Sequence, residues 1–172
     1  KFEENVLDAT QAWRLHVTEE ARLAGLPEDA RERAAAAARN RGLDGWILTL
    51  DFPCYLAVMS HATDRELRRE MYEAWVTRAS DHGPSAGKYD NGPVMAGILR
   101  LRQEAARILG FDNYAELSLA TKMASSVDEV RSFLEDLARR SRAAAERELD
   151  AVRAFAGQPL EAWDIAYWSE RL

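Results

Sequence analysis

The sequence predicts a mainly α-helical protein that contains one small two-stranded β element. Stretches rich in Ala, Arg and Glu, such as residues 31–39 and 141–156, favour helix because these residues are good helix formers. Apolar residues recur every three or four positions through much of the chain, whereas strict alternation is confined to short segments near the N-terminus. With 172 residues, of which 47% are hydrophobic and 30% charged, the chain is long enough to bury a core.

The β element is expected near the N-terminus, after a first amphipathic helix. In residues 12–17, AWRLHV, apolar and polar side chains alternate, which is typical of a half-buried strand. Its partner is predicted in residues 45–52, GWILTLDF, where β-branched and aromatic residues favour an extended chain. Residues 25–42 lie between the two and predict a helix, with Pro27 in its first turn and Gly42 able to close it in left-handed geometry.

From Pro53 onward the chain is expected to be helical. Three pairs of residues are typical of capping boxes at helix N-termini. They are Thr63 with Glu66, Asn113 with Glu116, and Ser126 with Glu129. The last pair begins the longest predicted helix, which continues through Phe155 over roughly 45 Å. Residues 80–93 hold three glycines and two prolines and predict a long loop, either functional or a plain surface connector.

Two of the predicted helices carry a clear apolar stripe at a spacing of three and four residues. In the first, the stripe consists of Val94, Ile98, Leu101, Ala105 and Ile108 or Leu109. In the longest helix it consists of Val127, Val130, Leu134, Leu137, Ser141, Ala145, Leu149 and Val152. Such spacing predicts that one face of each helix packs against other apolar groups.

Charge and composition exclude several classes of partner. The formal net charge of −6 argues against nucleic-acid binding, which needs a basic face, and the short basic cluster at residues 139–142 lies among acidic residues. No apolar run approaches the roughly 20 residues that span a bilayer, so no membrane partner is expected. The single cysteine, Cys54, lies in an apolar segment without a neighbouring base and is interpreted as a buried, inert thiol. A cytoplasmic location is the expectation.

Motifs that would supply chemistry are absent from these residues. The three histidines, His16, His61 and His82, belong to no H-E-x-x-H motif and to no E-x-x-H spacing. The sequence also lacks a phosphate-binding glycine loop, a dinucleotide fingerprint and a G-x-S-x-G motif. By themselves the residues assign no catalytic, cofactor-binding or metal-binding position and indicate a helical domain without a self-contained active site.

Large aromatic residues crowd the C-terminal end, where order is usually lost. Trp163, Tyr167 and Trp168 fall within the last ten residues. They are expected to pack against structure encoded after Leu172, which is then not the natural C-terminus. The apolar stripe of the first helix is already in progress at Phe2, so the N-terminal end is expected to be cut as well. The alternative is a terminal helix that folds back onto its own domain.

Six segments carry a family resemblance when they are taken together and in order. They read NVLDATQAW, LAGLPEDA, ILTLDFPCYLAVM, RELRREMYEAWVTRASDHGPSAGKYDN, ILRLRQEAARILGFDNYAELSLATKMA and WDIAYWSE, and they cover nearly the whole chain. In order and spacing they resemble consecutive stretches of the thimet-oligopeptidase family of zinc metallopeptidases. The loop TRASDHGPSAGKYDN is more similar to the oligopeptidase A branch than to the dipeptidyl carboxypeptidase branch.

The resemblance implies a mostly helical, two-lobed enzyme with a deep channel that admits short peptides. In this family zinc is held by the two histidines of H-E-x-x-H and a downstream glutamate, and the glutamate of the motif activates the metal-bound water. Residues 1–172 contain no H-E-x-x-H, so the resemblance implies that zinc and catalysis belong to a missing catalytic half. The chain is then an N-terminal-side, non-catalytic part of the channel wall, inactive by itself.

Contacts with the missing half have six candidate residues. They are Arg78, Tyr89 and Asp90, in or beside the Gly/Pro loop, and the terminal aromatics Trp163, Tyr167 and Trp168. A surface loop without a partner is the alternative for the first three. A function of another class is also open, namely a stand-alone helical interaction module that docks through the terminal aromatics. A fragment predicts self-association of the isolated chain, whereas a natural module predicts a clean monomer or a defined complex.

Overall fold

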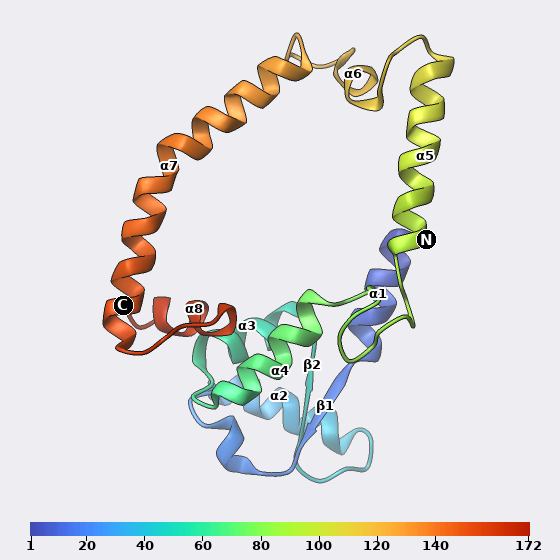
Figure 1. The fold of residues 1–172 in the computed structure, drawn as a ribbon. Helices are drawn as coiled ribbons and strands as arrows, with labels where there is room; N and C mark the ends of the chain where they lie inside the picture. The colour runs from blue at the N-terminus through green and yellow to red at the C-terminus, as the bar shows by residue number, and fades with distance from the viewer. The chain divides into compact units, whose positions relative to one another are not determined.

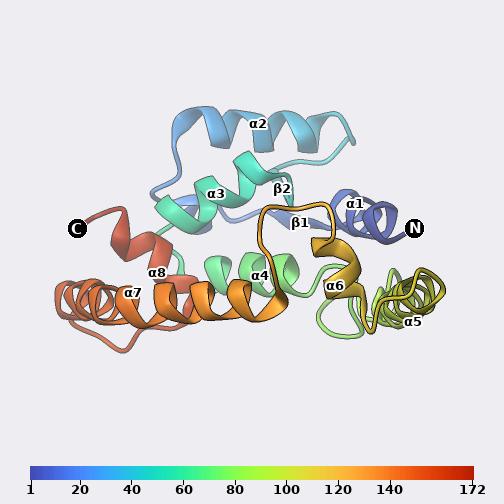
Figure 2. The same ribbon diagram turned by 90° about the horizontal axis from the view of Figure 1, so that it is seen from above.

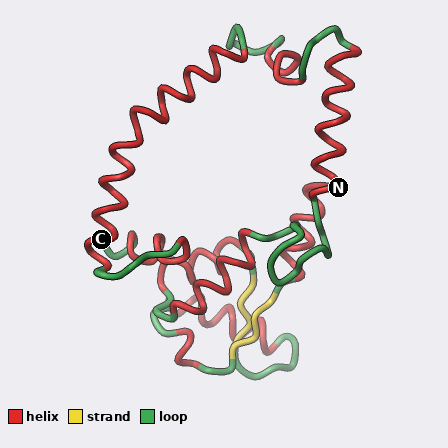
Figure 3. Tube along the Cα trace, viewed as in Figure 1, coloured by secondary structure: helices red, strands yellow, loops and turns green.

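The computed structural model describes all residues from Lys1 to Leu172 and is mainly α-helical, as the sequence predicts (Figures 1 and 3). Eight α-helices, one short 3-10 helix and two strands follow one another along the chain. They are α1 (Phe2–Ala12), β1 (Arg14–Val17), η1 (Glu20–Leu23), α2 (Glu28–Arg39), β2 (Trp46–Thr49), α3 (Phe52–His61), α4 (Arg65–Val76), α5 (Gly92–Ile108), α6 (Tyr114–Leu119), α7 (Val127–Ala156) and α8 (Ala162–Ser169). No helix combines the length and the apolar character needed to cross a membrane.

The chain divides into two compact units. Unit 1 consists of Lys1–Gly92 together with Val152–Leu172, and unit 2 consists of Pro93–Ala151. Unit 1 is therefore built from two stretches that are far apart in the sequence. It contains both strands, helices α1 to α4, the last residues of α7 and the whole of α8.

The predicted β element is confirmed in unit 1. Strands β1 and β2 pair antiparallel, with Arg14 opposite Thr49 and Val17 opposite Trp46. Val17 is buried and Arg14 is exposed, so the alternation along β1 separates a core side from a solvent side. Helix α2 connects the strands and packs on β2, and Figure 2 shows α2 on one side of the strands and α4 on the other.

The core of unit 1 lies between α2, the strands, α3 and α4. Its buried members are Val17, Leu23, Leu26, Ala34, Leu48, Leu50, Val58, Met59, Ala62, Leu67, Met71 and Ala74. Helix α4 buries Leu67, Met71 and Ala74, which recur at a spacing of three and four and so form one apolar face of the helix. Helix α8 packs on both α3 and α4, and Figure 1 shows it lying beside α3.

Two of the three predicted capping pairs are confirmed. The Asn113 side chain accepts a hydrogen bond from the Glu116 backbone N–H at 3.0 Å, and Ser126 Oγ accepts one from Glu129 N–H at 3.1 Å. The Thr63 prediction is wrong, because Asp64 is the N-cap of α4.

The carboxylate of Asp64 accepts from two free N–H groups of the first turn of α4, at 2.9 and 3.1 Å. A negative charge also suits the positive end of the helix, so aspartate is the better cap of the two neighbours. The Thr63 hydroxyl instead donates to the Ala24 carbonyl oxygen at 3.1 Å. The threonine therefore ties the start of α4 to the turn before α2.

That turn needs a glycine. Gly25 has a φ of +86°, and a Cβ at this position would lie 2.3 Å from the His61 carbonyl oxygen. The close approach lets the Thr63 backbone N–H donate to the Ala24 carbonyl oxygen at 2.9 Å. Only glycine accepts both the left-handed backbone and the contact without strain.

Unit 2 contains α6 and most of α5 and α7, and it lacks a core of its own. Between Pro93 and Ala151 the only buried residue is Ala106. Within this unit, α5, α6 and α7 make no substantial packing with one another. Several residues of the apolar stripes that the sequence places on α5 and α7 are exposed, including Ile108 at 84% and Leu134 at 57%, whereas Val152 at the end of the α7 stripe is buried in unit 1.

Candidate functional site

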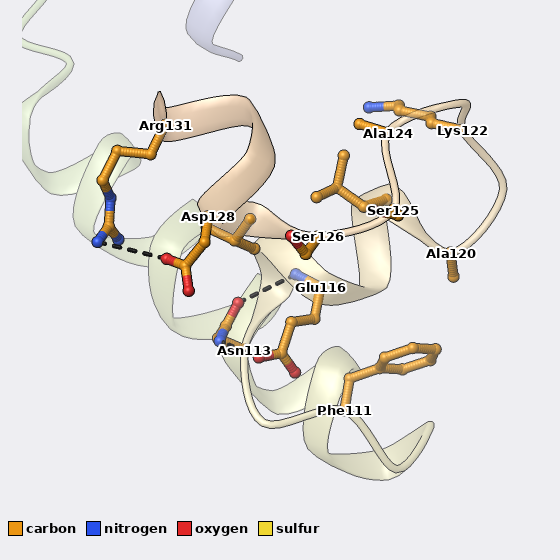
Figure 4. Close-up of a pocket in the computed structure, with 12 residues that line it drawn as sticks. Phe111, Asn113, Glu116, Ala120, Lys122, Ala124, Ser125, Ser126, Asp128 and Arg131 are labelled. Carbon is orange, nitrogen blue, oxygen red and sulfur yellow. Dashed lines mark hydrogen bonds and ion pairs between the residues drawn. The ribbon is translucent and has the colours of Figure 1, made fainter. Parts of the chain in front are cut away.

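A pocket of about 760 Å³ lies in unit 2, between α6 and the start of α7 (Figure 4). Phe111, in the segment before α6, and Asn113, the N-cap of α6, line one part of it. Ser125 and Ser126 line it from the turn before α7. Asp128 and Arg131 add charged groups at the rim, and their side chains are paired at 3.6 Å.

The polar groups of this pocket are already engaged with neighbours in the chain, several of them as helix caps. The Glu116 carboxylate accepts from Asp112 N–H at 3.3 Å and from the Asn113 amide at 3.1 Å. Ser125 donates both its N–H and its hydroxyl to the Glu129 carboxylate at 2.6 Å, and these bonds lower the pKa of that carboxyl. The pocket therefore orders the connection between two helices and shows no pair of groups arranged for acid–base chemistry.

Histidine, cysteine and carboxylate side chains do not converge on a metal site anywhere in residues 1–172, where no three of them lie close enough together to hold an ion. The His16 ring contacts the Asp44 carbonyl oxygen at 2.6 Å, and His82 lies 3.6 Å from Asp81 on the exposed loop. His61 ends α3.

Cys54 lies in the first turn of α3, where Asp51 is the N-cap. Burial raises the pKa of the Cys54 thiol, although the Thr49 N–H donates to its sulfur at 3.5 Å. A thiol with a raised pKa carries little thiolate near neutral pH, and the thiolate is the reactive form. Cys54 is half-buried rather than buried as the sequence suggested, and its raised pKa agrees with the interpretation of an inert thiol.

Maleimide labelling of Cys54 near neutral pH is expected to be at least about tenfold slower in the folded chain than in concentrated urea, because folding restricts access to the sulfur and lowers the fraction of thiolate. Mass spectrometry of the labelled chain gives both rates. Equal rates in the two conditions would contradict the partial burial of this thiol and its raised pKa.

The most highly connected charged group of unit 1 is the carboxylate of Asp164 in α8, which is 0% exposed. Arg68 Nη2 donates to its Oδ1 at 2.7 Å, and Arg65 Nη2 donates to its Oδ2 at 2.7 Å. The Glu161 N–H adds a further bond to Oδ2 at 3.0 Å. Burial pushes the pKa of Asp164 upward, but the bonds from Arg65, Glu161 and Arg68 outweigh it and leave the pKa below its usual value.

Tyr167 and Arg171 extend this cluster, which we call the α8 clamp and define as Arg65, Arg68, Asp164, Tyr167 and Arg171. The guanidinium groups of Arg68 and Arg171 lie 4.1 and 3.5 Å from the centre of the Tyr167 ring. Arg171 also donates to the Ser60 carbonyl oxygen at 2.8 Å, which satisfies the C-terminal end of α3. The sequence pattern indicates no role for Asp164 or for the arginines. The only signal was an acidic residue inside an aromatic stretch.

The terminal aromatics pack inside unit 1. Trp163 lies edge-on to Tyr72 of α4, with ring centres 6.1 Å apart, and borders the core. Trp168 lies edge-on to Phe155 at 6.0 Å and to Tyr167 at 5.2 Å, and its buried indole Nε1 has no hydrogen-bond partner in the chain. Helix α8 thus folds back onto its own unit, which is the alternative given for it above. Contacts of these aromatics with structure encoded after Leu172 stay a prediction.

The other three candidate contact residues are also engaged locally. The Arg78 guanidinium stacks on the Trp75 ring at 3.4 Å and donates to Thr10 Oγ1 at 3.1 Å. Asp90 accepts from Gly92 N–H at 2.8 Å, and Tyr89 lies 5.1 Å from the Lys88 ammonium. These contacts are compatible with a surface connector, and a role toward a missing half stays a prediction for all three.

The Gly/Pro loop, residues 80–93, is anchored near its C-terminal end by Asn91. Buried Asn91 accepts from the Asn5 amide at 2.9 Å and donates to the Phe2 carbonyl oxygen at 3.1 Å. Its N–H donates to the Ala79 carbonyl oxygen at 2.9 Å, and Ala79 adopts a φ of +53°. The Gly/Pro segment is thus an ordered surface loop closed by Asn91 and held to α1.

Sequence comparisons place these features in a family. Residues 58–172 match the model of Peptidase family M3. The chain is 53% identical to oligopeptidase A of Escherichia coli and 52% identical to oligopeptidase A of Salmonella typhimurium, over 99% of this chain and 26% of each of those proteins. It is 28% identical to dipeptidyl carboxypeptidase of Escherichia coli over 100% of this chain.

The chain spans about a quarter of the length of these relatives. Its identity to the oligopeptidases A is nearly twice its identity to the dipeptidyl carboxypeptidase. The resemblance noted from the six segments is therefore confirmed, and the chain belongs to peptidase family M3, the thimet-oligopeptidase family, on its oligopeptidase A branch.

Proposed function

We propose that residues 1–172 are a non-catalytic portion of a zinc-dependent oligopeptidase that hydrolyses short peptides. The observation that carries this proposal is the identity of 52–53% to proteins named oligopeptidase A over 99% of the chain. In this proposal the chain forms part of the wall of the peptide channel. The enzyme works in the cytoplasm, and its catalytic half lies outside these residues.

The zinc of such an enzyme does not fit the residues present here. No three histidine, cysteine or carboxylate side chains converge to hold an ion, and H-E-x-x-H does not occur. No chemical step is therefore assigned to residues 1–172. Their contribution is a folded scaffold whose ordered elements are the core of unit 1, the α8 clamp and the loop closed by Asn91.

Removal of metal tests the proposed activity. Hydrolysis of a short fluorogenic peptide by the full-length protein that carries this chain is expected to fall to background on dialysis against a chelator, and to return when zinc is added. Residues 1–172 alone, assayed beside it, are expected to show no hydrolysis. Full activity of the protein after metal removal would overturn the assignment as a zinc enzyme.

The second candidate is a stand-alone helical interaction module without enzymatic activity. The observation that favours it is the exposed apolar surface of α5 and α7, since large exposed apolar patches mark binding sites for other proteins. Sedimentation of isolated residues 1–172 separates the two. Concentration-dependent association supports a portion that lacks its normal cover, whereas a clean monomer favours the module.

A further inference from the structure

One face of α7 presents apolar and small side chains that nothing in unit 2 covers. Phe133, Leu134 and Leu137 are 62%, 57% and 47% exposed. We define the α7 face by the residues that continue this strip at helical spacing: Phe133, Leu134, Leu137, Ala138, Ser141, Ala145 and Leu149. All of them lie within unit 2.

The middle of the α7 face is hollow. Ala138, Ser141, Ala145 and Leu149 line a shallow groove of about 340 Å³. Arg142 and Glu146 form its polar edge and lie 3.8 Å apart. Small side chains flanked by leucines allow the backbone of another helix to come within roughly 8–10 Å of the axis of α7. The shape therefore fits a helix that inserts larger apolar side chains into the groove.

Unit 2 cannot provide that helix. Its α5, α6 and α7 segments make no substantial packing with one another, and Ala106 is its only buried residue. Helices of this kind draw most of their stability from tertiary packing of the apolar face, because isolated helices are marginal in water. An amphipathic pattern kept over the 30 residues of α7 thus implies a cover that unit 2 does not contain.

We propose that the α7 face is the surface on which the remaining part of the same peptidase chain docks. This inference rests on the proposed function. Its occupant follows from the relatives, in which a segment 52–53% identical to residues 1–172 forms only 26% of a single longer chain. Most of each relative is thus available to cover this face within one molecule, where docking carries no cost of bringing two separate proteins together.

A matched pair of substitutions on α7 tests the proposal in the full-length protein. Ala145→Glu places a carboxylate in the groove, whereas Ala143→Glu places the same group about 200° away around the same helix. Both alanines are exposed in residues 1–172, and glutamate is a good helix former at either site. Ala145→Glu is expected to lower the Tm of the full-length protein by at least about 2 °C, and Ala143→Glu is expected to leave it unchanged.

The same pair in isolated residues 1–172 is the control, and there the two variants are expected to have the same helix content and the same Tm. If Ala145→Glu prevents the full-length protein from folding, the milder pair Ala145→Cys and Ala143→Cys replaces it. Maleimide labelling, read by mass spectrometry, is expected to be at least about tenfold slower at position 145 than at 143 in the full-length protein, and equal in the isolated chain.

Equal Tm values for the two glutamate variants in the full-length protein, or equal labelling of the two cysteines, would overturn the docking proposal. A difference that disappears when the full-length protein is diluted would assign the face to a second copy and overturn it as well. The outcome is independent of the activity test. A protein without zinc-dependent hydrolysis but with selective protection at 145 would refute the proposed function and leave the docking surface standing.

Discussion

Replacing Asp164 with alanine is expected to lower the free energy of unfolding of the chain by about 3–5 kcal/mol. Asp164 is 0% exposed and Arg68 is 2% exposed, so the substitution leaves a guanidinium buried without its counter-charge. It also removes the carboxylate that joins α8 to α4 through Arg65. Breaking one side of a buried ion pair costs far more than the pair contributes as a whole, because the orphaned charge stays away from water.

Urea unfolding followed by tryptophan fluorescence measures this loss, because every tryptophan of the chain belongs to unit 1. Exposed Glu170 supplies a control, since Glu170→Ala is expected to change the free energy of unfolding by no more than about 0.5 kcal/mol. Adding Arg68→Met to Asp164→Ala is expected to recover part of the loss by removing the buried charge. A loss below about 1 kcal/mol for Asp164→Ala would show that the clamp contributes little.

The stabilisation by Asp164 is expected to depend on pH. Its pKa in the folded chain is lower than in the unfolded chain, so its contribution is complete above the unfolded value of about 3.9 and is lost as the pH falls toward the lower folded value. The difference in free energy of unfolding between wild type and Asp164→Ala therefore decreases as the solution is acidified below about pH 4. A difference that stays constant into that range would contradict the lowered pKa.

Truncating Leu67 to alanine is expected to lower the free energy of unfolding by about 2–5 kcal/mol. Leu67 is 0% exposed at the start of α4 and belongs to the core of unit 1, so the substitution loses buried apolar contact and leaves a cavity. Val76 is on the same helix and is 53% exposed, and Val76→Ala is expected to stay within about 0.5 kcal/mol of wild type. Equal losses of unfolding free energy for Leu67→Ala and Val76→Ala would contradict the assignment of Leu67 to the core of unit 1.

The elements that could be predicted from the sequence are those with a local signal. Alternation in residues 12–17 and capping at Asn113 and Ser126 depend on neighbours within a few residues, and all three are confirmed. At the start of α4 two adjacent residues could each serve as the cap. There the sequence pattern favoured Thr63, while two hydrogen bonds favour Asp64.

The α8 clamp could not be predicted, because its partners are distant in the sequence. Arg65 and Asp164 are separated by 99 residues, and no spacing rule links them. Read alone, Asp164 looks like one polar residue on an apolar terminal helix. Its burial follows only from the packing of α8 on α3 and α4. The apolar stripes of α5 and α7 could be read from the sequence, but the pattern does not identify what covers them.

The discontinuity of unit 1 has a consequence for synthesis on the ribosome. Arg68 emerges well before Asp164, and residues 93–151 must be made between the two stretches of the unit. At 5–20 residues per second, that interval lasts roughly 3–12 s. During this time α3 and α4 have formed without the helix that covers them, and the Arg68 guanidinium has no counter-charge. The nascent chain therefore passes through a period in which apolar surface is open to chaperones and to neighbouring chains, and the period ends when α8 emerges.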